Sequence, residues 1–130
     1  MDAIPRRVGT HPATVAARGL AAALLLVPTL GWAHAFPDHS DPRVGHTVDA
    51  SPPTVRIWFD GEIEPVFSTI RVEDADQRRV DKGDGHVDAR NNALLEVSLP
   101  SLPAGRYEVT WGVIARDGHR TEGRFKFRVR

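Results

Sequence analysis

Five stretches of the chain alternate hydrophobic and polar residues, and all of them lie after residue 50. They are residues 55–60, 70–73, 95–99, 107–113 and 124–129. An alternation with a period of two is typical of a β-strand that buries one face and exposes the other. Turn-forming pairs separate the stretches, namely Pro52-Pro53, Asp60-Gly61, Asp84-Gly85, Asn91-Asn92, Ala104-Gly105 and Asp117-Gly118. No window keeps a helical period over several turns, so we expect an all-β domain.

The number and spacing of these stretches predict the architecture. About seven strands in roughly a hundred residues indicate a seven-stranded β-sandwich or small barrel with Greek-key connections. The clean alternation indicates that each sheet has one face in solvent. Residues 80–92 are polar and rich in Asp and Gly, so we expect a mostly exposed connection there.

The start of the chain has the layout of a secretory signal peptide. An apolar run of 11 residues covers 20–30. A membrane-spanning helix needs about 20 apolar residues, and this run is shorter and contains Pro28. The run follows three basic residues, Arg6, Arg7 and Arg18. The adjacent Arg6 and Arg7 leave both general secretory and twin-arginine export open.

A cleavage site is predicted directly before His34. Gly31 and Ala33 place small residues at the −3 and −1 positions of such a site, as signal peptidases require. We therefore expect a signal peptide at residues 1–33 and a single exported, periplasmic domain at residues 34–130.

Charge and sulfur content exclude several classes of function. The chain has 17 basic and 17 acidic residues, and cleavage would remove three basic residues and one acidic residue. The mature domain is then slightly acidic, which argues against nucleic-acid binding. The chain has no cysteine, so disulfides and thiolate sites are excluded. Its single methionine is Met1, so the mature domain has no sulfur for a soft metal ion.

A histidine at a mature N-terminus offers two nitrogen ligands to one metal ion. If cleavage occurs before His34, its α-amine and its imidazole Nδ1 can chelate together. The α-amine titrates near pH 8, so it releases its proton to a metal more readily than a lysine does. Cu(II) favours such tetragonal nitrogen sites and is near the top of the divalent affinity order.

Asp117 and His119 are the candidate partners of His34. They are two residues apart, so an extended segment would direct both side chains to the same face, and Gly118 between them allows the backbone to bend. A second Asp-Gly-His, ending at His86, lies in the polar segment and is interpreted as a turn. His39 and His46 are interpreted as surface histidines, and His39 remains a possible assistant to the site.

Several landmarks of the mature chain resemble the CopC family of periplasmic copper-binding proteins. The resemblance covers nearly its whole length. It rests on His34-Ala35, Ser40-Asp41-Pro42, Gly45, Pro52-Pro53 leading into Val55 to Phe59, Leu99 to Leu102, Gly105, Tyr107, Val109-Thr110-Trp111, Asp117-Gly118-His119, Gly123 and Phe125 to Val129. It implies a cupredoxin-like or immunoglobulin-like β-fold and one Cu(II) ion bound by His34, Asp117 and His119.

The chain departs from the family pattern in two places. The methionine-rich Cu(I) site of some members is excluded, because the mature domain has no methionine. Many members carry an acidic residue just after the Phe that ends the second strand, where this chain has Gly61. Asp60 or Glu62 is therefore the candidate outer-shell partner of a ligand.

These observations favour a binding protein over an enzyme. We expect a monomeric periplasmic carrier or buffer that binds copper for homeostasis or resistance and delivers it to an inner-membrane copper transport protein. A copper-dependent oxidative enzyme with an N-terminal histidine is the first alternative, although the anionic Asp117 would disfavour reduction of the metal. The second alternative is a metal-free interaction domain, which would fit an uncleaved N-terminus.

Overall fold

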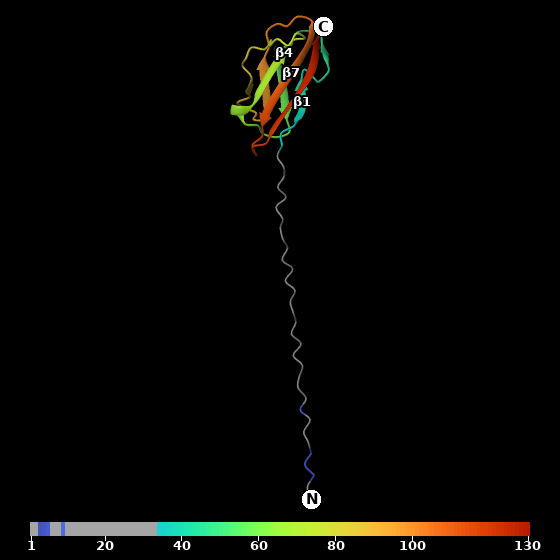
Figure 1. The fold of residues 1–130 in the computed structure, drawn as a ribbon, viewed down its shortest axis with the longest axis vertical. Coiled ribbons are helices and arrows are strands. Elements are labelled where there is room, and N and C mark those ends of the chain that lie inside the picture. The colour runs from blue at the N-terminus through green and yellow to red at the C-terminus, as the bar shows by residue number, and fades with distance from the viewer. Residues whose placement is uncertain (1–2, 6–8, 10–33) are drawn as a thin grey trace. The chain divides into compact units, whose positions relative to one another are not determined.

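A computed structural model of the chain describes residues 3–5, 9 and 34–130 (Figure 1). The predicted signal peptide at residues 1–33 therefore lies largely outside the described residues. No helix among the described residues has the length and apolar character needed to cross a bilayer.

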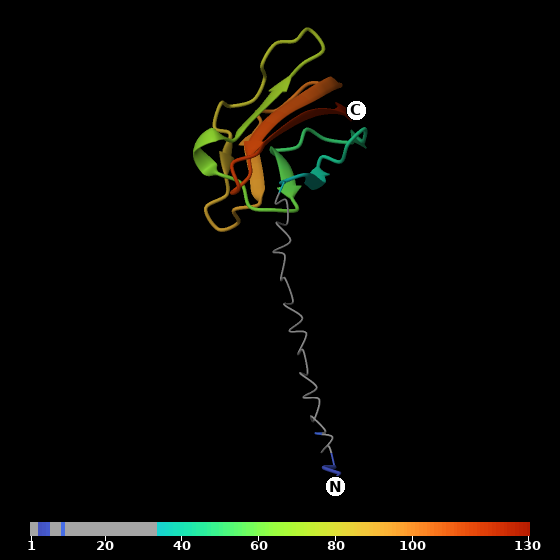
Figure 2. The same cartoon turned by 60° about the horizontal axis from the view of Figure 1, so that its bottom comes forward.

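Residues 34–130 form two four-stranded sheets (Figure 2). The first has the strand order β1 (Pro37–Asp41), β3 (Thr54–Phe59), β6 (Leu94–Ser98) and β5 (His86–Val87). The second has the order β2 (Thr47–Val48), β8 (Arg120–Val129), β7 (Gly105–Ile114) and β4 (Thr69–Glu73). A short 3-10 helix, η1 (Pro65–Phe67), precedes β4. The predicted all-β sandwich is confirmed.

The described part contains eight strands rather than the expected seven. Three of the eight, β1, β2 and β5, lie outside the alternating stretches. Of these, β2 and β5 are only two residues long, too short to show an alternating pattern. All five alternating stretches of the sequence do form strands: β3, β4, β6, β7 and β8.

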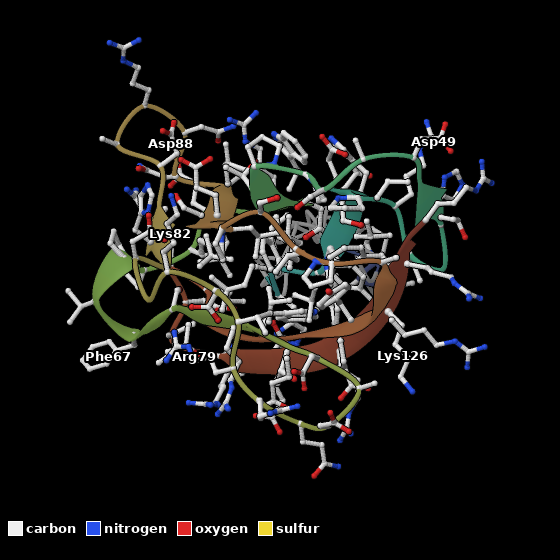
Figure 3. The ribbon with its side chains drawn as sticks, turned by 90° about the horizontal axis from the view of Figure 1, so that it is seen from above. Asp49, Phe67, Arg79, Lys82, Asp88 and Lys126 are labelled. Carbon is white, nitrogen blue, oxygen red and sulfur yellow. The ribbon has the colours of Figure 1, made fainter. Side chains whose placement is uncertain are left out.

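The core lies between the two sheets and is built from the apolar members of each alternation. Val55, Leu95, Val109 and Val113 are fully buried there. Charged side chains such as Asp88 and Lys126 point away from the sandwich (Figure 3). The longest strands, β7 and β8, pair from Gly105↔Val129 to Ile114↔Arg120, so the turn between them is held at one end of a continuous hairpin.

Two side chains of the polar segment after β4 are buried. Val87 in β5 is buried, and the side chain of Asp81 has no exposed surface. The Asp81 carboxylate accepts the backbone N–H groups of Val72 and Gly83, both at 2.8 Å, and the Arg79 Nε–H at 3.0 Å. Most of residues 80–92 are exposed, as expected. Val87 and the side chain of Asp81 are the exceptions, since a carboxylate can be buried when donors surround it.

These contacts set the charge state of Asp81. Burial by itself raises the pKa of this carboxyl, but the Arg79 guanidinium and the two backbone N–H donors outweigh it and hold the pKa below its ordinary value. The carboxylate is therefore stabilised in its anionic form.

Replacing Asp81 is expected to destabilise the fold. Asp81→Ala leaves the N–H of the buried Val72 without its acceptor, which costs about 2 kcal/mol of unfolding free energy. Because the folded pKa is lowered, the carboxylate contributes fully above the unfolded pKa of about 3.9, and the contribution is lost as pH falls toward the folded value. Urea denaturation between pH 3 and 7 should show Asp81→Asn lacking this acid-dependent loss. Asp76→Asn, at an exposed acid paired with Arg78, is the control and should retain it.

Candidate metal centre

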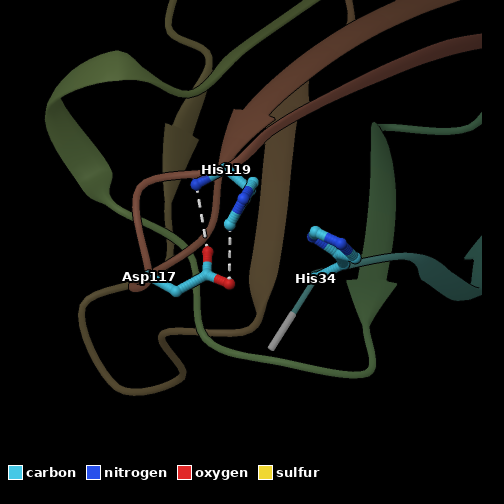
Figure 4. A group of neighbouring side chains, drawn as sticks. All are labelled: His34, Asp117 and His119. Carbon is cyan, nitrogen blue, oxygen red and sulfur yellow. Dashed lines mark hydrogen bonds and ion pairs between the residues drawn. The ribbon is translucent and has the colours of Figure 1, made fainter. Parts of the chain in front are cut away.

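The three predicted ligand residues meet at one end of the sandwich (Figure 4). His34 lies just before β1, while Asp117 and His119 belong to the turn between β7 and β8. One potential ligand atom from each residue can be chosen so that all three lie within 4.8 Å of one another. Residues distant in sequence are therefore neighbours here.

The turn that carries Asp117 and His119 is tight rather than extended. The N–H of Gly118 donates to the carbonyl of Ala115 at 2.9 Å, and the N–H of Ala115 donates to the carbonyl of His119 at 2.9 Å. Gly118 has a φ of +88°, a conformation that glycine adopts readily. Asp117-Gly118 was predicted as a turn-forming pair, and the structure confirms a turn that brings the Asp117 and His119 side chains together.

Asp117 closes this turn with its own carboxylate. Its Oδ1 accepts the backbone N–H of His119 at 3.0 Å, and its Oδ2 lies 2.9 Å from the His119 Nδ1. The His119 N–H is the main cause that lowers the pKa of Asp117, with the two histidine rings adding smaller contributions. The carboxyl is thus anionic at neutral pH and can act as an oxygen ligand.

His34 faces the turn from the opposite side. It is partly buried, and its ring centroid lies 4.6 Å from that of His119, with the ring planes at 90°. The ring centroid of the exposed Phe36 lies 5.9 Å from that of His34. In the chain that carries residues 1–33 the backbone nitrogen of His34 is an amide, so only cleavage before His34 would create an amine.

The other sequence candidates have different neighbours. His39 stacks on Trp58, with ring centroids 4.4 Å apart, and its Nδ1 lies 2.9 Å from Asp38. His86, in β5, pairs through Nε2 with Glu96 at 3.1 Å. Among the described residues, neither belongs to a group of potential ligands with His34.

The two candidate outer-shell acids have separate roles. Glu62 pairs with the Arg116 Nε at 2.8 Å, and its carbonyl accepts the Arg116 N–H at 3.2 Å. These two contacts of Glu62 hold Arg116, the residue before Asp117, in place. Asp60 instead contacts the segment that follows His34, since its Oδ1 accepts the N–H of Phe36 at 2.7 Å.

Sequence reasoning missed Thr121, whose hydroxyl donates to the carbonyl of Ala35 at 2.8 Å. A signal for it does exist in the sequence. Thr121 lies on the same face of β8 as the buried Phe125, Phe127 and Val129, where a polar side chain needs a hydrogen-bond partner. What the pattern does not reveal is that the partner belongs to the residue after His34.

The donor set fits a divalent copper ion. Two imidazoles and a carboxylate supply nitrogen and oxygen ligands, the type that suits Cu(II) rather than Cu(I). Ligands about 2 Å from one ion lie about 3–4 Å apart, and the candidate atoms of the three residues lie within 4.8 Å of one another. The described residues that form it contain no sulfur.

Several known proteins are similar to this chain over most of its length. A family model described as the CopC domain matches residues 38–130. The protein YobA of Escherichia coli (strain K12) is 31% identical over 107 residues, covering 82% of this chain and 86% of YobA. The copper transport protein CutJ of Bacillus subtilis (strain 168) is 28% identical over 107 residues, covering 82% of this chain and 20% of CutJ.

Solved structures show the same fold. The crystal structure of CopC from Methylosinus trichosporium OB3b aligns with a TM-score of 0.66 and 33% identity, covering 74% of this chain and 93% of that chain. PcoC, a methionine-rich copper resistance protein from Escherichia coli, aligns with a TM-score of 0.66 at 24% identity, covering 75% of this chain and all of PcoC (100%). With the family model matching most of its length, the chain belongs to the CopC family.

Proposed function

We propose that the mature protein begins at His34 and binds one Cu(II) ion in the periplasm. The α-amine and imidazole of His34, the carboxylate of Asp117 and the imidazole of His119 are the proposed ligands. The observation that carries this proposal is the convergence of these three side chains within 4.8 Å. The folded domain supplies the side chains, and removal of residues 1–33 supplies the amine.

The charge of the site supports Cu(II) as the bound ion. The anionic Asp117 stabilises the higher charge of Cu(II) more than that of Cu(I), and neutral nitrogen ligands complete a tetragonal set. A Cu(I) thioether site would need methionine, and Met1 is the single methionine of the full sequence. The bound ion is therefore cargo held in one oxidation state, a property that suits a carrier better than an electron-transfer protein.

The relatives support a role in copper handling. CutJ is named as a copper transport protein and PcoC as a copper resistance protein, and neither name describes a catalysed reaction. This agrees with the expectation that the chain is not an enzyme. We propose that the protein acts as a monomeric carrier or buffer and passes copper to a membrane transport protein.

Metal titration of the purified mature protein tests the proposal. We expect saturation at one tightly bound Cu(II) per chain, with a Cu(II) electron paramagnetic resonance (EPR) spectrum of nitrogen and oxygen ligation. Under anaerobic conditions with a competing Cu(I) chelator, the protein should retain little Cu(I), since it offers no sulfur ligand. Tight Cu(I) retention, or more than one tight Cu(II), would contradict the proposed site. An absence of Cu(II) binding would favour the metal-free alternative.

A further inference from the structure

The two residues after His34 are held by contacts from both sheets. Ala35 is completely buried, with 0% of its surface exposed, and its carbonyl accepts the hydroxyl hydrogen of Thr121 from β8. The N–H of Phe36 donates to the Asp60 Oδ1 at 2.7 Å, and the N–H of Asp60 donates back to the Phe36 carbonyl at 2.9 Å. Asp60 directly follows β3 of the other sheet. The backbone of residues 35–36 is thus fixed at its carbonyl and amide groups.

Gly61 lies beside this segment, with room for a methyl group between them. An ideal Cβ built on Gly61 would lie 3.8 Å from the His34 carbonyl oxygen and 3.9 Å from the Ala35 Cβ. These are ordinary van der Waals distances, so a methyl group fits at Gly61 and a longer side chain meets the backbone of His34. A small residue at position 35 is required as well, because overpacking a buried site forces neighbouring atoms apart.

We propose that Asp60 and Thr121 are positioning residues that hold the Ala35–Phe36 backbone so that His34 meets Asp117 and His119. This inference rests on the proposed Cu(II) site and adds residues that contact no metal ion. Chain termini are poorly ordered unless they are tied down, and ordering one residue costs about 1–2 kcal/mol. If Asp60 and Thr121 already order the terminus, this conformational entropy is not lost again when the terminus binds the ion.

The hydrogen bonds to Ala35 and Phe36 do not depend on cleavage. They use the backbone atoms of residues 35 and 36, and they are present in the chain that still carries residues 1–33. The positioning contacts are therefore formed before the amine exists. Cleavage has only to release the nitrogen of an already positioned His34.

Hydrogen exchange in the metal-free mature protein tests the contact itself. The Phe36 amide should exchange at least about tenfold faster in Asp60→Ala than in the unmodified protein, because its acceptor is removed. Asp60→Asn retains an oxygen acceptor at the same position and should preserve most of the protection. Equal Phe36 exchange in the unmodified protein and Asp60→Ala would overturn the role of Asp60.

Copper binding by the same variants tests the consequence. Asp60→Ala and Thr121→Val should each weaken Cu(II) binding about tenfold, a change of about 1.4 kcal/mol. Each should also alter the Cu(II) EPR spectrum, since the position of the His34 ligands becomes variable. Thr121→Ser retains the hydroxyl and should restore both the affinity and the spectrum, a pattern that a loss of packing alone would not produce.

Two substitutions serve as matched controls. Asp38→Ala removes an exposed acid of β1 that pairs with His39, and Gly61→Ala adds a methyl group where the structure has room. Both should leave the affinity and the spectrum unchanged. Thermal unfolding of every variant shows whether the fold is retained, and Thr121→Val and Asp60→Ala test the proposal independently if one of them unfolds.

The outcomes separate this inference from the proposed function. If the unmodified mature protein binds Cu(II) and both Asp60→Ala and Thr121→Val bind it equally well with the same spectrum, the positioning role is wrong and the copper site stands. If the unmodified protein binds no Cu(II), the proposed function fails, and the positioning of His34 toward a copper site fails with it.

Discussion

Acetylation of the α-amine of mature His34 is expected to weaken Cu(II) binding at least about a hundredfold, or about 2.7 kcal/mol. The acetyl group converts one of the proposed nitrogen ligands into an amide and leaves the three side chains unchanged. Selective acetylation is practical, because an α-amine titrates near pH 8 and a lysine near pH 10.4, so the α-amine reacts first near pH 6.5. Lys82 and Lys126 are the only lysines of the sequence, so mass spectrometry of peptides can confirm where the group was added.

The fold should not respond to this modification. His34 already carries an amide nitrogen in the chain that includes residues 1–33, and the sandwich forms around it with Ala35 buried. The acetylated and unmodified proteins should therefore unfold at the same temperature without metal. Unchanged Cu(II) affinity after complete acetylation would show that the amine is not a ligand, and the dependence of copper binding on cleavage would then be wrong.

Because the proposed site needs the α-amine of His34, cleavage during export would raise the affinity of the chain for Cu(II). Before cleavage the chain has the His34 ring, the Asp117 carboxylate and the His119 ring, but no terminal amine beside them. A precursor would thus bind Cu(II) more weakly than the mature protein. Under the proposed function, tight copper capture would therefore begin after residues 1–33 are removed.

The strands were predictable from the sequence because burial of one face imposes an alternation that survives in every long strand. The two-residue strand β5 has no such period, and its place in a polar segment concealed it. Asp81 was not predicted as a buried residue, since a carboxylate is buried only when donors converge on it, and here two of the donors are backbone groups of Val72 and Gly83. Because these donors are backbone N–H groups, their positions depend on the fold and cannot be recognised from the amino-acid types in the sequence.

The candidate site also has features that could be predicted from the sequence and features that could not. His34, Asp117 and His119 could be selected from residue chemistry and from the resemblance to a family, but their local geometry could not. The turn between β7 and β8 was predicted, but the hydrogen bonds that close it were not, and the hydrogen bond from Thr121 to Ala35 joins parts of the chain that share no sequence pattern. Tertiary contacts of this kind become visible only when both sheets are in place.

Removal of the His119 imidazole is the other change with a large expected effect. His119→Ala takes away one of the two imidazoles of the proposed site and the partner of the Asp117 Oδ2. We expect Cu(II) affinity to fall at least about a hundredfold, or about 2.7 kcal/mol. Competition with a Cu(II) chelator of known affinity measures this loss, and the EPR spectrum should lose one nitrogen coupling.

The chain provides its own control for this experiment. His86 ends a second Asp-Gly-His sequence, so His86→Ala makes the same chemical change in the same tripeptide. Its ring pairs with Glu96 across β5 and β6, and among the described residues it shares no ligand group with His34. His86→Ala should therefore leave Cu(II) affinity unchanged. Tight binding that survives His119→Ala would show that His119 is not a ligand, and an equal loss from both variants would show that convergence on His34 does not locate the site.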